Sequence, residues 1–279
     1  MLVNFNDILK EAYANHNAVG SFNGYNYETF KGIIDAGYET KTPVILAFGA
    51  KYLKNMTLET AYAIAKSLGE RVETPICLHL DHCSDVDTVF RAIRAGFGSV
   101  MYDGSALPFD ENVKNTKLVC DIAHACGVSV EAELGCLAAG ERSHEGLATD
   151  VEVYTEPIIA KQFIEATHVD ALAVSIGTVH GLYKAQPKIR FDILETINNL
   201  IEIPLVLHGG SGLPEKDILT CIAKGIAKIN INTEISIYAV DKTAELLASK
   251  QPHFSELSLN QVTYVKDIVT KYISFFAKS

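Results

Sequence analysis

The sequence contains no tryptophan, and its six cysteines include no C-x-x-C pair. A chain of 279 residues is also far larger than the small secreted scaffolds that disulfides hold together, so we expect reduced thiols. No run approaches the roughly 18 apolar residues of a membrane span. The N-terminal segment carries acidic residues early and lacks the uninterrupted apolar core of a signal peptide. These absences predict a cytoplasmic protein that does not enter a membrane.

Excess positive charge is also missing, because 24 Lys and Arg residues stand against 34 Asp and Glu residues and leave a net charge of -10. Such a chain repels a polyphosphate backbone, which argues against nucleic-acid binding. It can still bind a small anion locally, since helix N-termini and bound metal ions supply positive potential without changing the overall balance. Hydrophobic residues make up 48% and charged residues 21%, which is typical of a globular domain with a sizeable core.

Short apolar runs alternate with longer helical patterns through most of the sequence, which indicates βα units. The runs are nearly continuous in apolar residues, so both faces of each strand are expected to be buried, as in a parallel sheet covered by helices. Eight such units favour a closed (β/α)8 TIM barrel, in one α/β domain spanning residues 1–279, over a doubly wound open sheet. The predicted strands are 18–22, 43–48, 76–80, 98–102, 128–133, 171–176, 204–207 and 226–231.

Two segments depart from this alternation. Residues 134–155 form a connection longer than an ordinary βα loop and are a lid candidate. Residues 235–279 are predicted to contain one barrel helix and an extra C-terminal helix. The extra helix either packs on the barrel or forms a contact between copies, and we expect a homodimer or a homotetramer.

Histidines recur where the predicted strands end. His82, His180 and His208 follow three different strands, and active sites of α/β barrels lie at the face where strands end. One such histidine usually has a structural role, but three histidines at separate strand ends favour binding to one shared metal ion. Three neutral imidazoles with one open position suit a catalytic zinc ion. His79 lies earlier on its strand and is expected inside the barrel as an orienting or packed residue.

Carboxylates accompany these histidines. Asp81 stands between His79 and His82, where it is available as a general base or, alternatively, holds a ligand imidazole in one tautomer. Asp103 and Glu133 end neighbouring strands and could form a cluster for a second divalent or monovalent cation. The alternative for these two is hydrogen bonding to the ligand residues, because a buried carboxylate needs a cation or a donor facing it.

Glycine-rich turns after the last two strands predict a phosphate site. Glycine lets backbone N–H groups approach an anion, and a helix N-terminus follows. The first turn contains Gly209, Gly210, Ser211 and Gly212, and the second contains Asn230, Asn232 and Thr233. The first turn comes directly after a predicted metal ligand, which favours one substrate bearing a phosphate and a metal-chelating oxygen pair.

The sequence resembles the class II fructose-bisphosphate and tagatose-bisphosphate aldolases from about residue 3 to residue 250. The matching motifs, in order, are HLDH, SVM-x-D, SVEAELG, GT-x-HG-x-Y, PLVLHGGSG and KININTE. The resemblance implies a zinc-dependent aldolase that cleaves a phosphorylated ketose, fructose 1,6-bisphosphate or tagatose 1,6-bisphosphate, to dihydroxyacetone phosphate and an aldehyde through a metal-stabilised enediolate. It implies zinc ligands at His82, His180 and His208, with an alternate metal position near Asp103 and Glu133.

The same resemblance implies that Asp81 accepts the C4 hydroxyl proton, and that an acid on the loop after the fifth strand protonates the enediolate. Glu141 is the candidate for that acid, with Glu145 behind it. The residues implied to bind the substrate are Asn23, Gly181, Gly209, Gly210, Ser211, Asn230, Ile231, Asn232 and Thr233.

Three features depart from the family pattern. The loop sequence AAGERSHEG replaces the usual GG-x-EDD, Gly49 replaces a hydroxyl residue that contacts substrate, and the DPR-like segment is absent around residues 252–255. The sequence MYDGS is also similar to the MIDGS of inositol-catabolic aldolases, whose substrate has one phosphate. A monophosphorylated keto acid such as 6-phospho-5-dehydro-2-deoxygluconate is therefore the alternative substrate.

Other readings of the barrel remain open. A Schiff-base aldolase would need a strand lysine, for which Lys228 is the obvious candidate, and borohydride would trap its imine. A metal-dependent hydrolase would activate water and release no aldehyde. A metal-storage or scaffold protein would bind metal and turn over no ketose phosphate.

Overall fold

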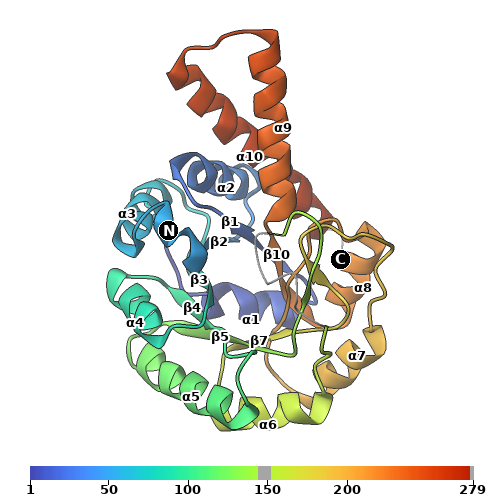
Figure 1. Cartoon of the computed structure of the whole chain (residues 1–279). Helices are drawn as coiled ribbons and strands as arrows, with labels where there is room; N and C mark the ends of the chain where they lie inside the picture. The colour runs from blue at the N-terminus through green and yellow to red at the C-terminus, as the bar shows by residue number, and fades with distance from the viewer. Residues whose placement is uncertain (144–151, 277–279) are drawn as a thin grey trace.

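The computed structural model describes residues 1–143 and 152–276 and shows a closed barrel of eight parallel strands (Figure 1). Around the barrel the strand order is β1-β10-β9-β7-β5-β4-β3-β2. The prediction of a TIM barrel is thereby confirmed, and the open sheet is wrong because β1 pairs with both β2 and β10. The barrel strands are β1 (Val19–Asn23), β2 (Val44–Gly49), β3 (Ile76–Cys83), β4 (Ser99–Tyr102), β5 (Ser129–Leu134), β7 (Ala171–Val174), β9 (Leu205–Leu207) and β10 (Ile226–Ile231).

Helices surround the barrel, and Figure 1 shows α9 and α10 projecting beyond it as a pair. The predicted extra C-terminal helix is α10, which packs mainly on α2 and α9. Among residues 1–143 and 152–276, no helix combines the length and the hydropathy that a membrane span requires. The helices are α1 (Asn6–Ala14), α2 (Tyr27–Thr40), η1 (Ala50–Lys54), α3 (Leu58–Gly69), α4 (Val86–Ala95), α5 (Phe109–Ala125), α6 (Pro157–Thr167), α7 (Phe191–Leu200), α8 (Glu215–Ala223), α9 (Thr233–Ser249) and α10 (Phe254–Phe276).

Alternate residues of each strand face the barrel interior, and their polarity changes along the barrel axis. At the N-terminal end the interior is apolar, and Phe5, Ile8 and Leu9 of α1 and the turn before it close it. Toward the C-terminal ends the inward positions become polar, as in Cys77, His79 and Asp81 along β3. The residues between them, such as Leu78 and Leu80, pack outward in the main hydrophobic core. The polar half of the interior therefore lies at the face where a barrel active site is expected.

The predicted lid segment, 134–155, is described in part. Leu134 ends β5, residues Ala138–Ala139 form the short strand β6, and Cys136 pairs with Val153 through two backbone hydrogen bonds of 2.9 Å. Residues 144–151, which include Glu145, lie outside the described residues. The strand β6 pairs with β8 (Val179–His180) in a separate two-stranded sheet. The sequence did not predict this sheet, because two-residue strands carry no periodicity.

Candidate active site

The structure brings His82, His180 and His208 together. They come from the end of β3, from β8 and from the residue after β9, and their ligand nitrogens all lie within 4.8 Å of one another. The ring centroids of His82 and His208 are 4.5 Å apart, and those of His82 and His180 are 4.9 Å apart. His180 and His208 are buried, whereas His82 is partly exposed. The three rings therefore surround one position that a divalent cation could occupy.

A local irregularity of β3 directs two consecutive side chains into the site. In a regular strand Asp81 and His82 would face opposite sides. The register between β3 and β4 shifts after Leu80, and His82 takes a left-handed backbone conformation with φ of 43°. A non-glycine residue in this region is strained, and such strain is concentrated at functional sites. The bulge lets Asp81 stay inside the barrel while His82 turns toward the other two histidines.

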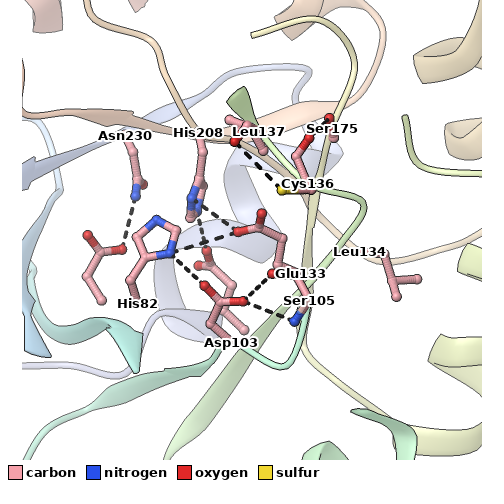
Figure 2. A network of polar contacts seen from close by, with 12 residues as sticks. His82, Asp103, Ser105, Glu133, Leu134, Cys136, Leu137, Ser175, His208 and Asn230 are labelled. Carbon is pink, nitrogen blue, oxygen red and sulfur yellow. Dashed lines mark hydrogen bonds and ion pairs between the residues drawn. The ribbon is translucent and has the colours of Figure 1, made fainter. Parts of the chain in front are cut away.

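The donor atoms at this site fit a metal ion. His82 Nε2 and His208 Nδ1 are buried and have no hydrogen-bond partner among the described residues. The opposite nitrogens are engaged, because His82 Nδ1 contacts Asp103 Oδ2 at 3.0 Å (Figure 2). His208 Nε2 contacts Glu131 Oε1 at 2.9 Å. A carboxylate on one ring nitrogen is the usual partner of a metal-ligating histidine, because it fixes the tautomer and raises ligand basicity.

The charges around the histidines also favour a cation. Burial would lower the pKa of His82, but the surrounding Asp81 and Asp103 carboxylates raise it well above its ordinary value. Burial and the nearby His82 lower the pKa of His208, which keeps that imidazole neutral, the form that binds a metal. The site therefore attracts one positive charge beside His82, whether a proton or a metal ion.

Asp103 and Glu133 lie beside the same histidine and form a second candidate cation position. His82, Asp103 and Glu133 present ligand atoms within 4.8 Å of one another. Asp103 is held by Ser105, whose N–H and hydroxyl donate to its Oδ1 at 3.1 and 2.6 Å. Burial and the Asp103 charge raise the pKa of Glu133 well above its usual range. Such a carboxyl group needs a proton or a cation, so either alternative for these two carboxylates is compatible with the geometry.

Asp81 is buried next to the histidines and is held by two amides. Asn23 Nδ2 donates to its Oδ2 at 2.8 Å, and Asn230 Nδ2 donates to its Oδ1 at 3.1 Å (Figure 2 shows the Asn230 contact). Burial would raise the pKa of Asp81, but His82 and Lys228 lower it well below its usual value. Asp81 is therefore ionised, which is the form that can accept a proton. Asn23 and Asn230, expected to bind substrate, also orient this carboxylate.

The two predicted phosphate turns lie side by side. The N–H of Gly210 donates to the carbonyl of Asn230 at 3.1 Å, and Ser211 Oγ accepts from the N–H of Asn232 at 3.2 Å. Gly209 has φ of 72°, and a Cβ there would collide with the carbonyl oxygen of Val179. Ile231, the last residue of β10, is fully buried, and Thr233 begins α9. The turn after β9 therefore faces the N-terminus of α9, an arrangement that suits an anion.

Glu141 and Gly181 meet near the histidines. The backbones of Glu141 and Leu182 exchange hydrogen bonds of 2.8 and 2.7 Å, two residues beyond His180. Gly181 has φ of 105° and packs against the Glu141 carbonyl so closely that a Cβ would not fit. The Glu141 side chain is exposed. The backbone at Glu141 is thus held two residues beyond His180, with its side chain exposed.

A buried ion pair lies beside His79, whose predicted place inside the barrel is confirmed, and the sequence did not predict this pair. Lys228 Nζ lies 2.7 Å from Glu131 Oε2, and both side chains are fully buried. His79 is also fully buried, with Nδ1 2.8 Å from Ser99 Oγ. Burial would raise the pKa of Glu131, but Lys228 and the His208 hydrogen bond lower it to about 2. The sequence feature that could have indicated this pair is a charged residue at an inward position of an otherwise apolar strand, as at Lys228.

Comparisons with known proteins agree with this geometry. The family model described as class-II fructose-bisphosphate aldolase matches residues 3–279. A protein named sulfofructosephosphate aldolase from Alkalicoccus urumqiensis is 40% identical over 230 residues, which cover 82% of this chain and 80% of that relative.

Solved structures give the same result. The crystal structure of the YdjI aldolase from Escherichia coli K12 has a TM-score of 0.88 at 35% identity and covers 99% of this chain and 97% of that chain. Fructose-bisphosphate aldolase from Campylobacter jejuni, with a TM-score of 0.80 at 20% identity over 98% of this chain and 93% of its own, shares the fold. The chain therefore belongs to the class-II fructose-bisphosphate aldolase family, and it is a lyase of that metal-dependent class.

Proposed function

We propose that this protein is a zinc-dependent aldolase that reversibly cleaves fructose 1,6-bisphosphate or tagatose 1,6-bisphosphate to dihydroxyacetone phosphate and an aldehyde, with residues 1–279 acting as one domain. The observation that carries the proposal is the convergence of His82, His180 and His208 within 4.8 Å. The ionised Asp81 and the glycine turn after β9 lie next to them. The residues proposed for metal binding, proton transfer and phosphate binding thus support one reaction site at this end of the barrel.

The three histidines would hold the catalytic ion, and Asp103 with Glu133 would hold a second cation or the ion's alternate position. When bound, zinc supplies a fixed positive charge that polarises the substrate carbonyl and favours the transition state by several kcal/mol. A carboxylate on one ring nitrogen of His82 and of His208 would hold a proton there and leave the other nitrogen of the ring to face the metal ion.

Asp81 is proposed as the base for cleavage. Its carboxylate accepts the proton of the hydroxyl on the carbon beyond the scissile bond. The new C=O bond forms as the carbon–carbon bond breaks, and the electron pair of that bond moves toward the ketone carbon. Asn23 and Asn230 fix the carboxylate on two sides, so its approach to the hydroxyl needs no reorganisation.

Two further groups complete the reaction. Glu141 is proposed to deliver the proton that replaces the broken bond on the dihydroxyacetone phosphate carbon, because its loop is anchored next to His180. Gly181, Gly209, Gly210, Ser211 and the segment Asn230–Thr233 are proposed to bind the phosphate. Backbone N–H groups at the start of α9 neutralise a phosphate without adding basic side chains, which suits an acidic chain.

The candidate substrates differ in the chemical group at the end of the molecule farther from the shared phosphate. A relative named sulfofructosephosphate aldolase, 40% identical to this chain, favours sulfofructose phosphate as a second candidate. The monophosphorylated 6-phospho-5-dehydro-2-deoxygluconate is the third. All three classes share the ketone, the neighbouring hydroxyl and one phosphate, which are the groups that the site is proposed to bind.

A coupled assay of aldehyde and dihydroxyacetone phosphate release tests the proposal. The zinc-loaded protein is given the two bisphosphates, sulfofructose phosphate and 6-phospho-5-dehydro-2-deoxygluconate at equal concentrations. We expect cleavage of a bisphosphate with the highest kcat/KM. A preference of at least about tenfold for one of the other two would reassign the substrate, and hydrolysis without aldehyde would contradict the aldolase proposal.

We also propose a homodimer or homotetramer. The helices α9 and α10 project from the barrel as a pair (Figure 1). They expose large apolar side chains that a partner would cover. These are Val240, Leu247, Phe254 and Leu259. Light scattering at micromolar concentration should give at least twice the 30.4 kDa chain mass, and a monomer would contradict the proposal. The double variant Val240→Glu/Phe254→Glu should shift the equilibrium toward monomer.

A further inference from the structure

The buried side chain of Glu131 links a lysine to one of the three clustered histidines. Its Oε2 lies 2.7 Å from Lys228 Nζ, and its Oε1 lies 2.9 Å from His208 Nε2. All three side chains are at most 1% exposed, so no bulk water shares these contacts. On its other side His208 presents Nδ1, which has no hydrogen-bond partner among the described residues.

The ion pair decides which nitrogen of His208 carries its proton. An ionised carboxylate can only accept hydrogen bonds, so the nitrogen that faces it must be protonated. Lys228 lies on the opposite oxygen and stabilises that ionised form in a site without solvent. The neutral imidazole then has its lone pair on Nδ1, the nitrogen that lies 3.6 Å from Glu133 Oε2 and has no hydrogen-bond partner among the described residues.

We propose that Glu131 is a positioning residue that, oriented by Lys228, fixes His208 as the Nε2–H tautomer and thereby presents Nδ1 to the metal. The inference rests on the proposed metal centre and assigns no contact with substrate to either residue. It gives Lys228 a role other than imine formation, because an ammonium group in a buried ion pair is not a nucleophile. It also gives a reason for the buried charges of Glu131 and Lys228, since a buried ion pair is by itself weak evidence for a role in stability.

The variant Glu131→Gln tests the proposal through the orientation of its amide. Lys228 can only donate, so it takes the amide oxygen and turns the NH2 group toward His208. His208 Nε2 must then accept, and its proton moves to Nδ1, the proposed ligand atom. The matched control is His79→Gln, which changes a buried side chain 3.7 Å from Glu131 and leaves the Glu131–His208 contact and the Glu131–Lys228 ion pair in place.

The measurement is made on metal-free protein titrated with zinc against a competing chelator, with ¹⁵N NMR of the imidazole nitrogens. The His208 resonances are assigned by their loss in His208→Gln. We expect Nε2–H in the wild type, Nδ1–H in Glu131→Gln, and zinc affinity lowered about 10- to 100-fold in that variant only. An unchanged tautomer with affinity within about twofold of wild type, or an equal loss in His79→Gln, would overturn the proposal.

A second variant covers the case in which Glu131→Gln does not fold. Glu131→Gln/Lys228→Met removes both charges and frees the amide oxygen to turn to His208. Its zinc affinity should be below that of the wild type and, where Glu131→Gln folds, above that of the single variant. Affinity equal to the wild type would show that the charge pair is not needed. If the wild type itself bound no zinc, the proposed metal centre would fail, an outcome distinct from failure of this inference.

Discussion

The amide of Asn23 at the end of β1 donates a 2.8 Å hydrogen bond to Asp81 near the end of β3, two strands away around the barrel. Asn230 at β10 holds the other oxygen of the same carboxylate. Because β1 lies between β10 and β2, the three residues are gathered only when the barrel closes. The proposed base is therefore a product of the closed fold, with its orientation set by two rigid strands.

Replacement of Asp81 by alanine should reduce kcat for cleavage at least about a hundredfold, the scale expected for a general base. The zinc content should stay at the wild-type level, because Asp81 is not among the grouped ligand residues. Steady-state kinetics with metal analysis of the same sample measures both. Asp87→Ala, an exposed carboxylate change on α4, is the control and should stay within about twofold. An undiminished rate in Asp81→Ala would remove Asp81 from the reaction.

Replacement of Glu141 by glutamine should slow the return of a proton to dihydroxyacetone phosphate, because the amide has no acidic proton to deliver. The exchange of a substrate hydrogen with deuterated water reports this step alone, and we expect a loss of about a hundredfold or more. Zinc affinity should not change, since Glu141 is exposed and outside the histidine cluster. Exchange at the wild-type rate would assign the acid to a different residue.

Gly209 and Gly127 allow backbone strain to be separated from crowding. Both have φ of 72°, but a Cβ at Gly127 has open space, whereas a Cβ at Gly209 collides with Val179 next to the histidine cluster. Gly127→Ala should lower the free energy of unfolding by about 1 to 2 kcal/mol, because only the left-handed backbone conformation disfavours alanine there. Gly209→Ala should cost more and also raise KM for the phosphorylated substrate. Equal unfolding free energies and an unchanged KM would contradict the proposed phosphate turn.

The buried His79 should make stability depend on pH. Burial, with a smaller effect from Lys228, lowers the pKa of His79 to about 3. In the unfolded chain a histidine titrates near pH 6.5, so below that pH His79 binds a proton in the unfolded state but stays neutral in the native state. The free energy of unfolding should then fall by about 2 kcal/mol for this group between pH 7 and pH 5.

Urea unfolding of metal-free wild type and His79→Gln at both pH values isolates that contribution. The wild type should lose about 2 kcal/mol more than the variant over this interval, because all other titrating groups are common to both. Equal losses would show that His79 is protonated in the native state.

The strands were predictable because each is an apolar run, and all eight predicted segments overlap barrel strands. The clustering of His82, His180 and His208 followed from placing them at strand ends. The left-handed φ of His82 was not predictable, since it arises from a register shift against β4. Nor was the pair Glu131 and Lys228, because the two strands that carry it are far apart in the sequence and face each other across the closed barrel.

The most direct test of the metal-dependent mechanism is the cleavage rate before and after removal of metal from the same protein sample. Chelation should abolish turnover of the preferred ketose phosphate, and addition of one equivalent of zinc, or of cobalt, should restore it. Metal-free protein that still cleaves the substrate at the original rate would contradict the account.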